Sequence, residues 1–152
     1  MLSPGDIIHY SNFIFENGTV RNKYFIILHN NPCLALITTS NSLRYPMVDS
    51  LGCHSPKMTF FIPALHHATF PKPTYLVMTK IWEFEDATVK QLISESIVTK
   101  KTPLTAKLLL DIKDCLKNFH EDIATEHWNI IFTEKTPSKG SLNDLLNKFN
   151  RR

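Results

Sequence analysis

The sequence predicts an α+β fold, mainly β, in which strands come first along the chain and helices last. Short apolar runs, bounded by turn-forming residues such as Asn17-Gly18, fill most of the first half of the chain. Apolar residues recur at helical spacing only after Glu83. The aromatic share of 11%, with ten Phe, is typical of a core built on a sheet. This order of elements fits an α+β arrangement or a small barrel with helical additions.

Five apolar runs have the length and composition of strands. Asn17-Gly18, the strongest short hairpin signal, returns the chain from the first run to the second. The second run is apolar on both faces, which predicts a central strand. Two stretches, 38–56 and 63–73, lack periodicity and are expected to be loops with a functional role. The expected strands cover residues 7–10, 24–28, 33–37, 58–62 and 74–79.

Helical spacing predicts two helices in the second half of the chain. The first is expected to begin at Asp86, a suitable N-cap. The second is expected to open at Thr102-Pro103, a capping residue followed by proline at the first helical position. Residues 128–132 are expected to add a strand. We therefore predict one domain over 1–134, followed by a linker and a short helical tail over 135–152.

Length and composition favour a globular protein of the cytoplasm. A chain of 152 residues is expected to bury about two thirds of the surface that its unfolded form exposes. Its net charge of +3 is compatible with a nucleic-acid partner but is far from a dense basic stripe. No secretory signal opens the sequence, and no apolar run approaches the ~20 residues that span a bilayer. Cys33 and Cys115 are expected to be small buried hydrophobes, and the scattered cysteines fit a reducing compartment.

Four short segments carry a resemblance to a known family. Residues 4–8 (PGDII) open a strand, and Val20-Arg21 precedes an apolar run. Residues 34–40 (LALITTS) form an apolar strand that ends in hydroxyl side chains, and residues 74–81 (TYLVMTKI) form another. In order and spacing, these segments resemble the MazF/PemK family of toxin endoribonucleases over residues 4–118.

Two positions depart from the family pattern. Asn22 stands where the family has proline, and Lys80 stands where it has glutamine. The resemblance implies a small SH3-like β-barrel with C-terminal helices, which cleaves single-stranded RNA without a metal. In that reaction a 2′-hydroxyl attacks the neighbouring phosphate and leaves a cyclic phosphate and a free 5′-hydroxyl. A homodimer and a cognate antitoxin protein are the further partners that it implies, and neither a cofactor nor a membrane is expected.

The expected catalytic residues are Arg21, Thr38, Thr39 and Glu16. Arg21 presents a fork of donors that matches phosphate and stays charged, so we expect it to stabilise the phosphoryl oxygens. The two threonines are expected to donate hydroxyl hydrogen bonds to the same oxygens. Glu16 lies in the preceding loop, where it is expected to orient Arg21 or act as the base. The structural alternatives are a surface arginine, a polar strand edge and a solvated carboxylate.

A basic and aromatic surface is expected to bind the RNA strand, because bases stack on aromatic rings beside a positively charged groove. His54 and His66 lie in the two long loops and are alternatives for the general acid or base. Together with Cys53 and His67 they lack the paired spacing of a zinc site, so no metal is expected. The expected RNA-binding residues are Ser40, Arg44, Tyr45, Lys80, Trp82, His54 and His66.

A second function remains open from the sequence. The departures at Asn22 and Lys80 favour a non-catalytic SH3-like module that binds protein or nucleic acid. The retained Arg21 and Thr38 favour the enzyme. A hydrolase of another kind is disfavoured, because the sequence has no Gly-x-Ser-x-Gly, His-Glu-x-x-His or phosphate-loop motif.

Overall fold

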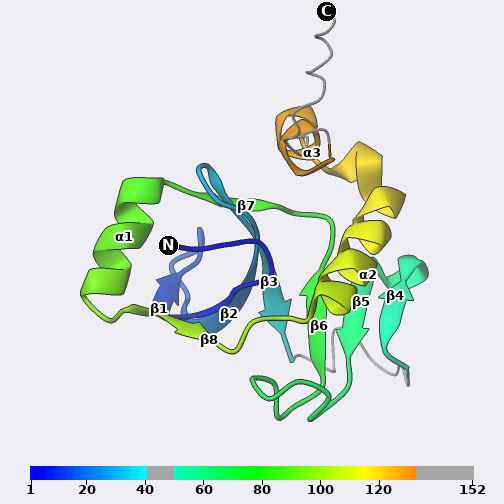
Figure 1. Ribbon diagram of the computed structural model, residues 1–152, viewed down its shortest axis with the longest axis horizontal. Coiled ribbons are helices and arrows are strands. Elements are labelled where there is room, and N and C mark those ends of the chain that lie inside the picture. The colour runs from blue at the N-terminus through cyan, green and yellow to red at the C-terminus, as the bar shows by residue number, and fades with distance from the viewer. Residues whose placement is uncertain (41–49, 133–152) are drawn as a thin grey trace, which may run out of the picture.

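The computed structural model describes residues 1–40 and 50–132 (Figure 1). The predicted tail over 135–152 lies outside the described residues. Three α-helices occur in the described part: α1 (Asp86–Ser94), α2 (Ala106–Leu116) and α3 (Thr125–Phe132). Two short 3-10 helices are η1 (Ser55–Lys57) and η2 (Lys117–Asp122). The strands are β1 (Ile7–Ile14), β2 (Val20–His29), β3 (Cys33–Thr39), β4 (Gly52–His54), β5 (Thr59–Ile62), β6 (Thr74–Val77), β7 (Trp82–Phe84) and β8 (Val98–Lys101).

The strands form a mainly antiparallel sheet, which confirms the α+β class. Hydrogen-bonded neighbours follow the order β4-β5-β6-β3-β2-β1-β8, and β7 pairs with β3 beside this path. β3 connects the strands β2, β1 and β8 on one side to the strands β6, β5 and β4 on the other. It pairs with β2 and β7 along most of its length and with β6 at Thr38 and Thr39. Within the described residues no pairing joins β4 to β8 at the two ends of the path.

The central strands are buried on both faces, as the apolar run over 24–28 predicts. Side chains alternate along a strand, so neighbouring residues of β2 enter different parts of the core. Ile26 and Leu28 pack in the cluster that contains Leu108 and Ile112 of α2. Phe25 and Ile27 pack in the cluster that contains Val89 of α1. Figure 1 shows α1 and α2 on opposite sides of these strands.

Neither predicted helix begins where the sequence indicates, since α2 begins later and α1 begins one residue earlier. The N-cap of α2 is Thr105, whose side-chain oxygen accepts a hydrogen bond from the Leu108 N–H at 3.1 Å, and not Thr102. Leu104 lies before the helix because its N–H donates to the Gly5 carbonyl at 2.8 Å, which holds the backbone against the start of β1. In α1 the N-cap is Glu85, and Asp86 is the first helical residue.

Several elements differ from the prediction. Residues 128–132 belong to α3 and do not form a strand, because an apolar run this short has no periodicity that separates the two structures. β4, β7 and β8 were not predicted, and β4 lies in the stretch 38–56 that was expected to be a loop. β8 is an edge strand with a single buried side chain, Val98, and its pairing with β1 gives no apolar signal in the sequence.

The cysteines also require a correction. Cys53 of β4 and Cys115 of α2 form a disulfide, with 2.04 Å between the two sulfur atoms. Cys115 is buried as predicted but is not a free thiol, so the cysteine pattern no longer favours a reducing compartment. Cys33 is fully buried, and the pKa of its thiol is raised to about 11. Burial is the larger cause, and the negative charge of Asp86 is the smaller one. Among the described residues no helix has the length and apolar character needed to cross a membrane.

Candidate functional site

Two adjoining hollows open where β2 begins and β3 ends. The inner cavity has a volume of about 260 Å³ and is lined by residues 22–24 of β2, residues 38–40 at the end of β3, residues 69–72 and Thr74. The outer hollow is about 520 Å³. Lys23, Thr39 and Ser40 line both. The residues of the outer hollow are Phe15, Asn17, Thr19, Arg21, Lys23, Thr39 and Ser40.

The antiparallel register of β2 and β3 brings these residues together. Phe25 pairs with Ile37, and antiparallel partners step in opposite directions along the two strands. Lys23 therefore comes beside Thr39 at the point where β3 ends. The β1–β2 hairpin places Phe15 and Asn17 next to the start of β2, because the Phe15 N–H donates to the Thr19 carbonyl at 2.8 Å.

Three cationic side chains surround the shared wall. Arg21 is exposed, and its Nη1 donates to the Val20 carbonyl at 3.0 Å. Lys23 is half-buried, and its pKa is lowered first by burial and then by the charge of Arg21. Lys72 is exposed on the other side of the inner cavity. None of the three forms an ion pair with another described residue, so their charge is available to an anion.

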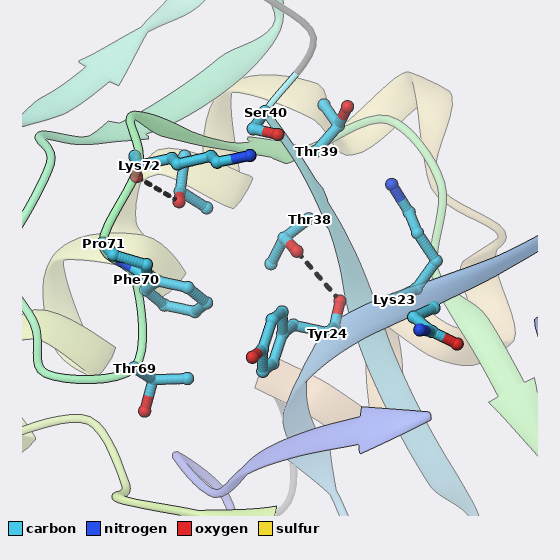
Figure 2. Close-up of a pocket in the computed structure, with 11 residues that line it drawn as sticks. Lys23, Tyr24, Thr38, Thr39, Ser40, Thr69, Phe70, Pro71 and Lys72 are labelled. Atoms are coloured by element: carbon cyan, nitrogen blue, oxygen red, sulfur yellow. Dashed lines mark hydrogen bonds between the residues drawn. The ribbon is translucent and has the colours of Figure 1, made fainter. Parts of the chain in front are cut away.

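The hydroxyl groups of the site differ in exposure. Thr38 is only 5% exposed, and its Oγ1 donates to the Tyr24 carbonyl at 3.1 Å. Its proton is therefore already in use, although the residue lines the inner cavity. Thr39 is half-buried and Ser40 is exposed, and both lie on the wall that the hollows share. In Figure 2 Lys72 extends its ammonium group toward Ser40.

The inner cavity also has two aromatic walls, neither of which is among the expected RNA-binding residues. Figure 2 shows the rings of Tyr24 and Phe70 converging from opposite sides below Thr38. Their centroids are 5.6 Å apart in an edge-to-face arrangement. The loop that carries Phe70 is held by His67, whose Nε2 donates to the Pro103 carbonyl at 3.0 Å and whose Nδ1 accepts from the Thr69 N–H at 3.1 Å. These two bonds require the tautomer of His67 in which Nε2 carries the proton and Nδ1 does not.

Of the predicted catalytic residues, Arg21, Thr38 and Thr39 lie around these hollows, and Glu16 does not. Glu16 is exposed, and its Oε2 lies 3.8 Å from Nζ of Lys80. The carboxylate therefore pairs with Lys80, and the ion pairs of the described residues do not join it to Arg21, so the expected role of Glu16 stays a prediction.

Trp82 is also placed differently from the expectation. Its indole ring packs against Phe13 and Phe25 in the core, and Nζ of Lys80 lies 4.1 Å from its ring centroid. The indole N–H is enclosed and has no hydrogen-bond partner among the described residues. Trp82 is therefore part of an aromatic cluster and does not offer an open face for a base.

The remaining predicted residues are dispersed. His54 lies on β4, where its Nε2 is 3.0 Å from the Ser50 carbonyl oxygen, and His66 is exposed in the loop after β5. Neither lines either hollow. Ser40 lies in the shared wall, whereas Arg44 and Tyr45 lie outside the described residues. Within 1–40 and 50–132, no group of three or more His, Cys, Asp or Glu side chains could hold a metal ion.

The catalytic and RNA-binding residues expected from the sequence did not include Lys23, Tyr24, Phe70 or Lys72. Lys23 and Tyr24 directly follow Arg21 and Asn22 in the sequence, so their position close to the expected site of Arg21 could have been predicted. Phe70 and Lys72 come from a distant loop, and the pairing of β3 with β6 brings them here. Comparison of this chain with protein-family models, curated proteins and solved structures finds no match.

Proposed function

We propose that this protein is a metal-independent endoribonuclease of the MazF/PemK type, built on an SH3-like barrel and acting on single-stranded RNA. The observation that supports it is the shared wall of the two hollows. There Arg21 and Lys23, which have no acidic partner among the described residues, line one hollow with Thr39 and Ser40. Cations that are unpaired and adjacent to hydroxyl donors suit a phosphate group, which accepts hydrogen bonds at several oxygens.

The chemistry assigns a role to each of these groups. The 2′-hydroxyl of the RNA gives its proton to the solvent and attacks the neighbouring phosphorus. The bond from phosphorus to the 5′-oxygen breaks as that oxygen takes up a proton, and a cyclic phosphate and a 5′-hydroxyl remain. Arg21 stabilises the charge that builds on the phosphoryl oxygens, and Thr39 and Ser40 donate hydrogen bonds to them. Lys23 suits the protonation of the leaving 5′-oxygen, because a lysine with a lowered pKa releases its proton more readily.

The test is cleavage of an end-labelled single-stranded RNA by the purified protein in excess EDTA. We expect cleavage to persist and the products to carry a cyclic phosphate and a 5′-hydroxyl. Arg21→Ala should reduce the rate by about a hundredfold or more, the usual effect of losing one transition-state donor. Arg21→Lys should also be poor, because an ammonium group lacks the forked geometry. Lys57→Ala, at an exposed lysine outside both hollows, serves as the control.

Two results would contradict the proposal. Cleavage that is lost in EDTA and restored by zinc or magnesium would indicate a metal-dependent enzyme. A folded Arg21→Ala protein that cleaves like the unaltered one would exclude the assigned site.

A second candidate, a nucleic-acid-binding module without catalysis, is favoured by one observation. In the described part of the chain, no histidine or carboxylate lines either hollow, so the most common proton-transfer groups are missing there. This alternative predicts that the protein binds single-stranded RNA in a fluorescence anisotropy assay and releases it intact. The partners that accompany the enzyme proposal are a second copy of the chain and a cognate antitoxin, with the cytoplasm as the location.

A further inference from the structure

We infer that the inner cavity is a nucleobase pocket, which receives one unpaired base while the adjoining phosphate lies against the wall shared with the outer hollow. This inference rests on the proposed function, because it names what the same site recognises in an RNA strand. It does not depend on cleavage, since a binding module would use the pocket in the same way.

The size and walls of the cavity fit a flat heterocycle. Its volume of about 260 Å³ is below the range of about 300–1,000 Å³ that is usual for pockets holding whole drug-sized ligands. Phe70 is 2% exposed, and its ring meets the ring of Tyr24 edge-to-face, so the two rings give the cavity a fixed apolar side. Aromatic walls of this kind are the usual contact surface for unstacked bases of single-stranded RNA.

Unpaired polar groups distinguish this cavity from a purely apolar one. The hydroxyl groups of Tyr24 and Thr69 make no hydrogen bond within the described part of the chain. Both residues line the cavity (Figure 2). A hydroxyl group can donate or accept, so this pair can match the mixed donors and acceptors on the edge of a base.

The position of the cavity relative to the cations matches the layout of a nucleotide. Lys23, Thr39 and Ser40 line both the inner cavity and the outer hollow, so one molecule can contact both spaces. Lys72 extends toward Ser40 at the top of the cavity in Figure 2 and adds positive charge at this boundary. The boundary therefore suits a phosphate, and the space below it suits the attached base.

The cavity is also preorganised, which favours selection among bases. His67 is 9% exposed, and it bonds both to the carbonyl of Pro103 and to the N–H of Thr69. These bonds fix the residue that presents one of the two hydroxyl groups. A site with fixed hydrogen-bonding groups discriminates against ligands that leave those groups unpaired.

The experiment compares short RNA strands of equal length by fluorescence anisotropy. The strands carry 2′-O-methyl groups, so that they bind without cleavage, and have either one kind of base throughout or no bases at all. We expect strands with the preferred base to bind at least about fivefold more tightly than the abasic strand, since contact with an aromatic wall typically contributes this much per base. We also expect the four kinds of base to differ in affinity.

Two variants test the hydroxyl groups. Tyr24→Phe keeps the ring and Thr69→Val keeps the side-chain shape, and each should reduce the difference between bases by about threefold to tenfold, as expected for one hydrogen bond. Tyr10→Phe removes a tyrosine hydroxyl outside both hollows and should change nothing. Lys72→Ala should weaken all strands equally, the abasic one included, and lower the slope of log affinity against log salt by about one.

The outcomes separate this inference from the proposed function. Equal binding of abasic and base-containing strands would overturn the nucleobase pocket and leave a phosphate site intact. Base preferences that are unchanged in both Tyr24→Phe and Thr69→Val would also overturn it, because neither hydroxyl group would then contact the base. If no strand binds at any salt concentration, the proposed function and the inference both fail.

Discussion

Lys23 lies half-buried in the wall that the inner cavity and the outer hollow share. Burial, followed by the charge of Arg21, lowers its pKa from the ordinary value of 10.5. Between the lowered folded pKa and the unfolded value, the unfolded state binds more protons, so the free energy of unfolding rises with pH across that interval. At lower pH the charged Lys23 destabilises the folded state. Lys23, which we propose as a binding residue, is thus held at a cost in stability.

We therefore predict that Lys23→Met makes the protein more stable at neutral pH. The gain should shrink as the pH rises toward 10.5, because Lys23 then becomes neutral in the unaltered protein as well. Urea denaturation midpoints measured over a series of pH values test this. Lys72→Met, at an exposed lysine of the same cavity, should show a smaller change. A Lys23→Met protein that is less stable at every pH would mean that lost packing outweighs the relieved charge.

Single residues were predictable where the chain order itself carried the signal. Arg21 stands directly before an apolar run, and Thr38-Thr39-Ser40 directly follow another, so both sets were expected at strand ends. The burial of Thr38 was not predictable, because it follows from the bond between its hydroxyl and the Tyr24 carbonyl of the neighbouring strand. The pairing of Glu16 with Lys80 likewise joins residues that are far apart in the sequence.

The disulfide between β4 and α2 gives a prediction about elements. It links residues 62 positions apart, and a loop of that length contributes about 4 kcal/mol in the chain-entropy account of cross-links. Reduction should therefore lower the urea denaturation midpoint of the unaltered protein. The Cys53→Ser variant should show the same midpoint with and without reductant. A midpoint of the unaltered protein that does not move on reduction would indicate that β4 stays in place without the bond.

α3 is attached to β7 by the contact between His127 and Glu83. Nε2 of His127 lies 2.8 Å from Oε1 of Glu83, and Trp128 stacks on His120 with ring centroids 4.1 Å apart. We predict that Glu83→Gln accelerates amide hydrogen exchange in residues 125–132 by a factor of up to about five, since the pair is partly exposed. Glu126→Gln, in the first turn of the same helix, is the control. Equal exchange in both variants would show that aromatic packing alone holds α3.

Elements were predictable where the signal is local. The hairpin at Asn17-Gly18 forms as expected, because the Gly18 N–H donates to the Phe15 carbonyl and Asn17 Oδ1 accepts from the Thr19 N–H. β8 and the start of α2 depend on distant partners instead. β8 exists through its pairing with β1, and Leu104 is held outside the helix by Gly5.

At the scale of the whole molecule, the order of strands and helices was sufficient to predict the α+β class. The composition of the site was not predictable from this order, because the wall of the inner cavity formed by residues 69–72 comes from the loop after β5. That loop reaches the end of β3 through the pairing of Thr38 with Leu76 and through the contact between His67 and Pro103. Neither contact has a periodic or compositional signature in the sequence.

The last prediction concerns assembly, and we expect a homodimer. Ile14 and Val20 face each other across β1 and β2 and are 66% and 44% exposed, so the hairpin ends in an apolar pair that the described chain leaves uncovered. Sedimentation at micromolar concentration should give twice the chain mass of 17.5 kDa. Ile14→Glu should shift the protein toward the monomer if this pair lies in the interface.

Leu110→Glu is the matched control, because Leu110 is similarly exposed, at 58%, but lies on α2. A monomer under all conditions would contradict the homodimer. A dimer that survives Ile14→Glu but not Leu110→Glu would place the interface on the helical side. The hairpin also contributes Phe15, Asn17 and Thr19 to the outer hollow. Burial of its apolar end against a second copy would therefore bring the partner close to the proposed phosphate site, and Ile14→Glu should then weaken RNA binding together with the dimer.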